Sequence, residues 1–132
     1  MLYVDSSALL KRYVDEPDSA LCEDLLLADA RWVTGRHTSI EVRRNLARVV
    51  EPKAQGPALQ DFMRDWRRFL VVELDAVTCE RAASIAEATG VRTLDALHLA
   101  AAARVGGGLR FLTFDVKQAQ SARGLGMTVV GL

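Results

Sequence analysis

Short apolar runs alternate with longer segments of helical periodicity along the 132 residues of the chain. The short runs are rich in β-branched and aromatic side chains and end at polar or turn-forming residues, which is typical of buried strands. Five strands are expected, at residues 2–4, 32–34, 70–72, 111–114 and 127–130. Between them, apolar side chains recur every three or four positions and predict seven helices. These helices are expected at residues 8–14, 17–28, 38–49, 57–69, 76–90, 93–105 and 116–123.

Capping residues define several of the expected helix starts. The serines at 6–7 can cap the first helix, and Pro17 fits the first turn of the second. Thr38 and Glu41 have the spacing of a capping box, in which two side chains satisfy free N–H groups at a helix start. Pro57 is expected to start the fourth helix.

Alternating strands and helices favour a parallel sheet that is covered by helices on both faces. The expected fold is therefore α/β, a three-layer α/β/α arrangement in which residues 1–132 form a single domain. Half of the residues are apolar and 26% are charged, which excludes a disordered chain. At this length roughly two-thirds of the unfolded chain's surface can be buried, so neither disulfides nor structural zinc is needed.

Composition also narrows the location and the partners. Cys22 and Cys79 form no C-x-x-C pair, which fits a reducing cytosol. No uncharged run approaches the ~18 residues that a membrane span needs, so we expect a cytoplasmic protein that contacts no membrane. The 17 Lys and Arg residues balance the 17 Asp and Glu residues, so an anionic partner must be bound by local side chains rather than by net charge.

Four acidic residues fall where strands end or helices begin. Asp5 and Asp115 each follow a predicted strand, whereas Glu41 and Asp95 each lie in the first turn of a helix. These positions converge at one edge of a parallel α/β sheet. Each acid alone is explained by helix capping or by the helix dipole. Together the four carboxylates would repel one another, because the partial positive charges of helix N-termini are too small to neutralise them all. A bound divalent cation would relieve that repulsion.

Such a cluster also indicates a chemistry. Oxygen ligands without a nearby cysteine or a pair of histidines suit hard ions, which favours Mg²⁺ or Mn²⁺ over zinc. A divalent ion there can activate water and neutralise the charge that builds on a phosphodiester. The residues alone therefore indicate a metal-dependent phosphoryl hydrolase, with one or two ions.

Four segments resemble, in order, the four sequence blocks of PIN-domain ribonucleases, especially VapC-type toxins of bacterial toxin–antitoxin pairs. The segments are LYVDSSALL at 2–10, SIEV at 39–42, TLDALHLA at 93–100 and LTFD at 112–115. The resemblance implies a five-stranded parallel sheet and an endoribonuclease that acts as a homodimer. It also implies a VapB-type antitoxin that occupies the site within a higher toxin–antitoxin assembly.

The same resemblance implies roles for particular residues. Asp5, Glu41, Asp95 and Asp115 would be the catalytic acids around Mg²⁺ or Mn²⁺. Ser6 and Thr113 would orient these carboxylates or the water at the ion.

Two histidines and two arginines lie near the expected site. His98 follows Asp95 by three residues and can hydrogen-bond that acid, although a buried structural histidine is the favoured interpretation. His37 precedes a helix start and could contact substrate, although a solvated loop histidine is the favoured interpretation. Arg44 and Arg48 share a helical face with Glu41 and can bind RNA phosphates, or else pair with Glu41 within the helix.

One apolar stripe is expected to be core, with a dimer or antitoxin groove as the alternative. It consists of Leu59, Phe62, Met63, Trp66 and Phe69.

Two other functions fit parts of the sequence. A catalytically silent RNA-binding or protein-interaction module would use the acids only as helix caps. A receiver-like signalling domain also gathers acids and Mg²⁺ at this edge of a sheet. Domains of that kind, however, have adjacent acidic residues directly after their first strand. Here Asp5 is followed by two serines, which disfavours the receiver.

Overall fold

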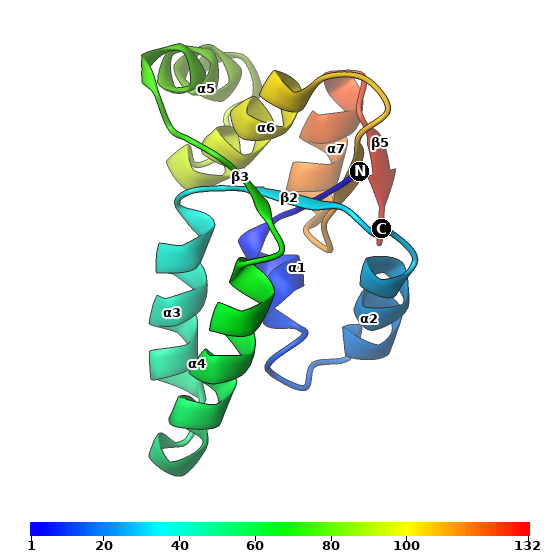
Figure 1. The fold of residues 1–132 in the computed structure, drawn as a ribbon. Coiled ribbons are helices and arrows are strands. Elements are labelled where there is room, and N and C mark those ends of the chain that lie inside the picture. The colour runs from blue at the N-terminus through cyan, green and yellow to red at the C-terminus, as the bar shows by residue number, and fades with distance from the viewer.

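The computed structural model describes residues 1–132 and contains one five-stranded, all-parallel sheet with the strand order β3-β2-β1-β4-β5 (Figure 1). The strands are β1 (Leu2–Val4), β2 (Trp32–Gly35), β3 (Leu70–Val72), β4 (Arg110–Leu112) and β5 (Thr128–Val130). The helices are α1 (Ser6–Leu10), α2 (Ser19–Leu27), α3 (Thr38–Val49), α4 (Pro52–Trp66), α5 (Ala76–Thr89), α6 (Thr93–Val105) and α7 (Val116–Gly124). No helix combines the length and the apolar character that crossing a bilayer requires.

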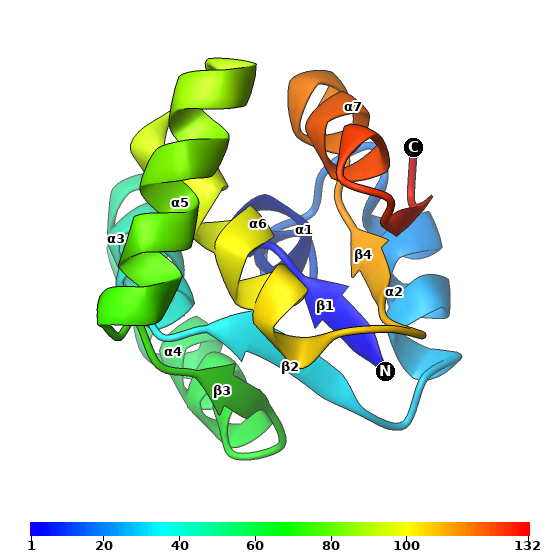
Figure 2. The same cartoon turned by 90° about the horizontal axis from the view of Figure 1, so that it is seen from above.

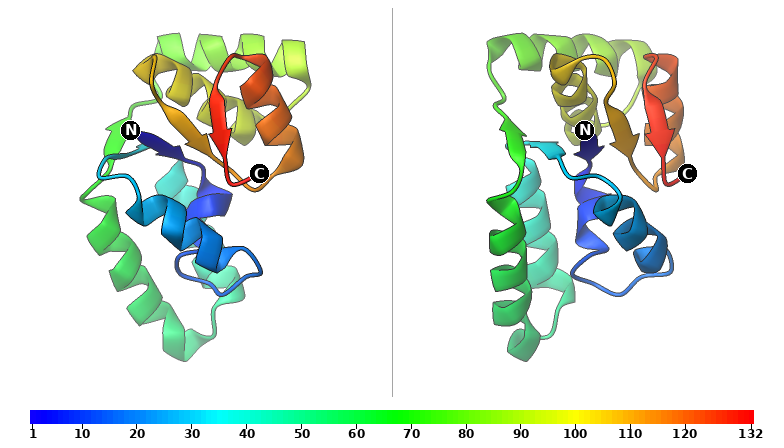
Figure 3. Two further views of the ribbon diagram at one scale, coloured as in Figure 1. Left: turned by 90° about the vertical axis from the view of Figure 1, so that its right-hand side faces the viewer. Right: turned by 45° about the vertical axis from the view of Figure 1, so that its right-hand side comes forward.

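Alternation along the strands divides the core between the two faces of the sheet. Tyr3 of β1 packs into one cluster with side chains of α5, α6 and α7, whereas Leu2 and Val4 pack into the other with α1, α2, α3 and α4. On β4, Phe111 and Leu112 divide in the same way. Figures 1 and 3 show these two groups of helices on opposite sides of the sheet. The predicted three-layer α/β/α fold is therefore confirmed.

The first two helices begin differently from the prediction. Asp5, rather than the serines, caps α1, because its Oδ1 accepts a hydrogen bond from the Ala8 N–H at 2.8 Å. The second helix begins at Ser19, two residues after Pro17. Ser19 Oγ accepts from the Glu16 N–H at 2.9 Å and holds the preceding segment in a turn, which explains the late start.

The predicted capping box on α3 is wrong. The Thr38 hydroxyl lies 2.7 Å from the Thr34 hydroxyl and caps no N–H group, so Glu41 has no capping partner. The predicted start of α4 at Pro57 is also wrong, because the helix begins at Pro52 and contains Pro57. Pro52 fits the first helical position, because an N–H group there has no partner within the helix and proline loses no hydrogen bond.

The apolar stripe of α4 divides between core and surface. Phe62 and Phe69 are buried, but Leu59 is 36% and Met63 is 39% exposed. The expectation that the whole stripe is core is wrong for these two side chains. The reason is that α4 packs mainly against α3 at the edge of its layer, so only part of the stripe meets another element.

The strand order shows at which edge of the sheet a ligand site is expected. The central strand β1 pairs with β2 on one side and with β4 on the other, so the chain reverses its direction of winding at β1 (Figure 2). Ligand sites of open α/β sheets lie beyond the carboxyl ends of the strands at such a switch point. Asp5 follows β1 and Asp115 follows β4, so both lie at that crevice.

Candidate active site

Asp5 is a buried carboxylate at the end of the central strand. Its Oδ1 accepts hydrogen bonds from the Ala8 N–H at 2.8 Å and the Ser7 hydroxyl at 2.9 Å. Burial raises the pKa of Asp5, while the positive charge of His98 and the Thr113 hydroxyl act in the opposite direction. Capping thus fixes the orientation of this carboxylate through one of its two oxygens.

Thr113 connects Asp5 with Asp115. The Thr113 side chain is fully buried, and its Oγ1 accepts a hydrogen bond from the Asp115 N–H at 3.1 Å. Asp115 is exposed and caps α7, since its Oδ1 accepts from the Gln118 N–H at 2.7 Å. Both acids that follow strands are therefore helix caps. The Thr113 hydroxyl interacts with the side chain of Asp5 and with the main-chain N–H of Asp115.

Asp95 is the acid on which the charges of the other three act. Its carboxylate is half-buried in the first turn of α6 and accepts no hydrogen bond, although Gln118 Nε2 donates to its main-chain oxygen at 3.2 Å. Burial raises the pKa of Asp95, and His98 opposes this. The negative charges of the other three acids raise it further; these are Asp115, Asp5 and Glu41. The charges of the other three acids therefore act on Asp95 at this edge of the sheet, and joint binding of an ion by the four stays a prediction.

Glu41 is held by an imidazole from another helix. His98 Nε2 lies 2.9 Å from Glu41 Oε1. Burial works against ionisation of Glu41, but the hydrogen bond and charge of His98 and the Ser6 hydroxyl together keep the pKa of Glu41 below its ordinary value. The protein itself therefore stabilises the ionised form of Glu41, in contrast to Asp5 and Asp95.

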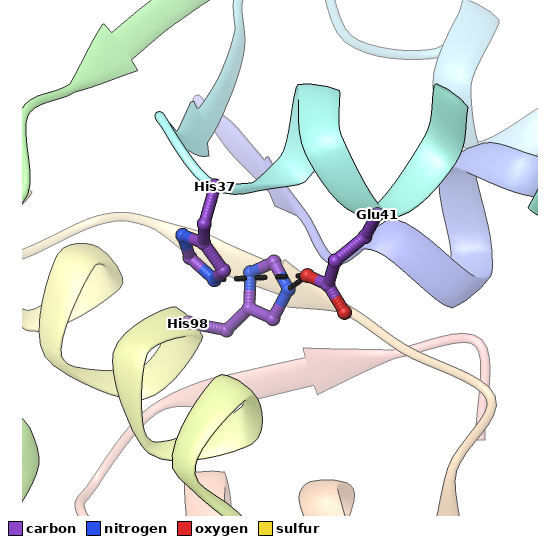
Figure 4. Close-up of side chains that lie close together, drawn as sticks. All are labelled: His37, Glu41 and His98. Atoms are coloured by element: carbon purple, nitrogen blue, oxygen red, sulfur yellow. Dashed lines mark hydrogen bonds and ion pairs between the residues drawn. The ribbon is translucent and has the colours of Figure 1, made fainter. Parts of the chain in front are cut away.

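His98 is a buried histidine with three polar neighbours. Its Nδ1 lies 2.9 Å from the Tyr3 hydroxyl, and its Nε2 lies 3.3 Å from the Ser6 hydroxyl as well as near Glu41. The favoured interpretation of His98 as buried is confirmed. Its acidic partner is Glu41 rather than Asp95, because the first turn of α3, which carries Glu41, lies opposite the turn of α6 that carries His98 (Figure 4).

His37 was expected to be solvated, and that expectation is wrong. The residue is only 5% exposed, and its ring lies over the ring of His98 with centroids 4.1 Å apart. Gly35 leaves the space for it, since a Cβ atom there would lie 2.6 Å from His37 Cε1. Burial and the charge of His98 lower the pKa of His37 to about 4. The acids therefore do have a pair of histidines beside them, contrary to the sequence prediction.

The two arginines of α3 do not pair with Glu41. Arg48 donates to Asn45 Oδ1 at 3.1 Å, and Arg44 is exposed without an ion pair. The alternative of intrahelical pairing with Glu41 is wrong, because His98 occupies that carboxylate. Both guanidinium groups thus remain on the outer face of the helix that carries Glu41.

The chemistry of the acidic cluster fits a divalent cation. Asp95 is a half-buried carboxylate that no protein donor stabilises, and three further carboxylates raise its pKa. A dication would replace this repulsion by attraction, and carboxylate oxygens are the ligands that hard ions prefer.

Comparison with known proteins shows the same architecture and related sequences. Ribonuclease VapC35 of Mycobacterium tuberculosis is 33% identical over 135 residues, which cover 98% of this chain and 96% of that protein. Ribonuclease VapC46 of the same organism is 32% identical over 136 residues, covering 98% and 95%.

Solved structures match the fold along most of the chain. The structure of VapC20 of M. tuberculosis, described as a toxin that cleaves the sarcin–ricin loop, has a TM-score of 0.76 at 17% identity and covers 92% of this chain and 95% of that one. A toxin–antitoxin complex from Klebsiella pneumoniae has a TM-score of 0.74 at 16% identity, covering 98% and 96%. The family model of the PIN domain matches residues 2–124. The chain therefore belongs to the PIN domain family.

Proposed function

We propose that this chain is the toxin of a toxin–antitoxin pair and hydrolyses RNA phosphodiester bonds with Mg²⁺ or Mn²⁺. The relatives named Ribonuclease VapC support the activity, and the similar toxin–antitoxin complex supports the pairing. The observation that carries the proposal is the half-buried Asp95 carboxylate, which accepts no hydrogen bond and is repelled by the charges of three other acids, because a divalent ion would relieve that repulsion. The ligands would be Asp5, Glu41, Asp95 and Asp115.

The protein's own side chains would prepare the site. Asp5 and Asp115 each use one oxygen as a helix cap, which fixes the carboxylate and leaves its second oxygen for the ion. Thr113 holds the relative positions of these two acids, while Ser6 and His98 hold Glu41. When bound, the ion would supply positive charge to the scissile phosphate and activate water.

RNA would approach along the outer face of α3. Arg44 and Arg48 are exposed there, one and two turns after Glu41. A guanidinium group binds a phosphate through two N–H groups, so these arginines would hold phosphates next to the cleaved one. Such contacts position the strand without reading its bases.

The proposed partners are a VapB-type antitoxin and a second copy of this chain. Exposed apolar side chains on α3 and α4 suit such contacts, since apolar area is commonly buried when proteins associate. They include Ile40, Val49, Leu59 and Met63.

A silent binding module remains the second candidate, because two of the acids do cap helices. Asp5 and Asp115 would keep that role without any ion. The capping role alone leaves the unpaired, half-buried Asp95 without an explanation, which favours the nuclease.

Cleavage and metal binding together test the proposal. Purified protein free of antitoxin should cut RNA with Mn²⁺ or Mg²⁺, and either ion should raise the Tm, as a ligand of the folded state must. Asp95→Asn should lower cleavage by about 100-fold or more and remove the rise in Tm. Glu87→Gln is the matched control, since Glu87 is exposed on α5 and has no ion pair. Folded wild-type protein that neither cuts RNA nor responds to the ions would contradict the proposal.

A further inference from the structure

Three potential metal ligands from two parts of the chain converge beside the acidic cluster. His37 precedes α3, Glu41 lies on its first turn and His98 comes from α6, and Figure 4 shows the three side chains pointing toward one another. Each offers one ligand atom, and the three atoms lie within 4.8 Å of one another. Two of them are nitrogens, so this set differs in kind from the oxygen-only set of the four acids.

The separations suit a tetrahedral ion after small side-chain movements. Ligands about 2.1 Å from a tetrahedral ion lie about 3.4 Å from one another. His98 Nε2 and Glu41 Oε1 are 2.9 Å apart, and His37 Nε2 and Glu41 Oε1 are 3.8 Å apart. These two distances bracket the required one.

His37 supplies an independent indication of a ligand. Both of its ring nitrogens are buried, and neither has a partner in good hydrogen-bond geometry, although the main chain of Leu94 lies near enough to raise the pKa of His37 against the effect of burial. Buried polar atoms without a partner are rare, and such atoms commonly face an ion or an ordered water. Burial of the ring beside a second imidazole therefore costs stability that a bound ion would recover.

The surroundings of His98 match those of a metal ligand. The Tyr3 hydroxyl lies 2.9 Å from Nδ1, so the ring is held with Nε2 toward Glu41. Histidines that bind metals generally have their second nitrogen fixed by such a hydrogen bond.

We propose that His37, Glu41 and His98 form a binding site for a borderline divalent ion of the Zn²⁺ class. Nitrogen ligands prefer such ions over Mg²⁺, whereas the acidic cluster prefers hard ions. The two sites share Glu41, so an ion on the histidines takes one carboxylate away from the acidic cluster. On the basis of the proposed nuclease function, Zn²⁺ is therefore an inhibitor that acts at a site separate from that of the activating ion.

Binding is tested without RNA. Zn²⁺ is titrated into metal-free protein by calorimetry and by NMR of the imidazole groups, which report only His37 and His98 because the chain has two histidines. Zn²⁺ should bind, shift the signals of both rings and release protons from the ligands. His37→Gln should weaken binding by roughly 10-fold or more. Circular dichroism establishes that the variant is folded.

A matched variant separates the two metal sites. Asp115→Asn removes a member of the acidic cluster that takes no part in the histidine site, so Zn²⁺ binding should remain while the effect of Mn²⁺ on Tm is lost. His37→Gln should show the reverse pattern. The proposal is overturned if Zn²⁺ does not bind to wild type, or if it binds equally to wild type and His37→Gln. If the variant fails to fold, the NMR spectra of wild type decide whether Zn²⁺ binds the two histidines.

Inhibition is tested with RNA. Zn²⁺ should slow Mn²⁺-dependent cleavage by wild type, and the slowing in His37→Gln, measured against that variant's own rate without Zn²⁺, should be smaller. Binding without inhibition overturns the competition for Glu41. Absence of cleavage under all conditions contradicts the nuclease function instead, and leaves the metal site to be judged from calorimetry and NMR.

Discussion

His98 Nε2 on α6 lies 2.9 Å from Glu41 Oε1 on α3, and the Tyr3 hydroxyl of the central strand lies 2.9 Å from the other nitrogen of the same ring. One imidazole thus connects the sheet, a core helix and a carboxylate of the candidate site. The orientation of Glu41 is therefore set by the core of the protein.

Replacement of His98 tests this connection. His98→Leu preserves the approximate size of the side chain but leaves Tyr3 and Glu41 without their hydrogen-bond partner. We therefore expect a loss of about 2–4 kcal/mol in the free energy of unfolding. His98→Gln can still hydrogen-bond one of them and should recover part of the loss. Urea unfolding measures both. Equal stability of the two variants would contradict the role of the hydrogen bonds.

Asp95→Asn should stabilise the metal-free protein. Burial and the charges of the other acids raise the pKa of Asp95, so ionised Asp95 destabilises the folded state at every pH above that value. Removing its charge should raise stability at pH 7 by about 0.5–1 kcal/mol, or the Tm by roughly 2–4 °C. The sign should reverse with saturating Mn²⁺, which then stabilises only wild type. A lower Tm of the metal-free variant would show that the acids do not repel one another.

His37 should make the metal-free protein less stable in acid. Burial and the charge of His98 lower the pKa of His37 from 6.5 to about 4, so between these values the unfolded chain binds a proton that the folded chain does not. Above pH 6.5 the ring is neutral in both states and its titration does not affect stability, whereas the free energy of unfolding falls as the pH drops from 6.5 toward 4, by about 3 kcal/mol in total.

The His37→Gln variant lacks this proton. Its free energy of unfolding should therefore fall less steeply than that of wild type between pH 6.5 and 4, in urea titrations without divalent ions. Parallel curves for the two proteins would show that His37 titrates normally in the folded state.

The acidic positions were predictable because they depend on local rules. A residue that directly follows a parallel strand, such as Asp5, lies at a known edge of the sheet, and so does Asp95 in the first turn of a helix that leads to the next strand. The five strands and the layers were predictable for the same reason, since alternation and helical periodicity are written in neighbouring residues.

Contacts that depend on how helices cross were not predictable. Nothing near His37 in sequence indicates that its ring lies on His98, although Gly35 two residues earlier is consistent with a close approach. Likewise Thr38 and Glu41 have the spacing of a capping box, but partners from β2 and α6 take both side chains. Tertiary hydrogen bonds override the local pattern in such cases.

Asp65 of α4 forms a buried polar contact of the same unpredictable kind. It is 2% exposed and accepts from Arg12 Nε at 2.7 Å and from the Tyr13 hydroxyl at 2.8 Å. This ties α4 to the turn after α1. One helical turn earlier, Asp61 pairs with Arg64 at 3.1 Å, with side chains that are 55% and 69% exposed.

The two aspartates should differ sharply when each is replaced by alanine. Asp65→Ala removes the buried acceptor of both Arg12 and Tyr13, while Arg12 keeps its ion pair with Glu23, and should cost about 2–3 kcal/mol in the free energy of unfolding. Asp61→Ala removes a solvated pair and should cost less than about 0.5 kcal/mol, because water and salt screen it. Urea unfolding of the two variants at pH 7 makes the comparison within one helix, and similar losses would show that burial of the Asp65 carboxylate does not determine its contribution.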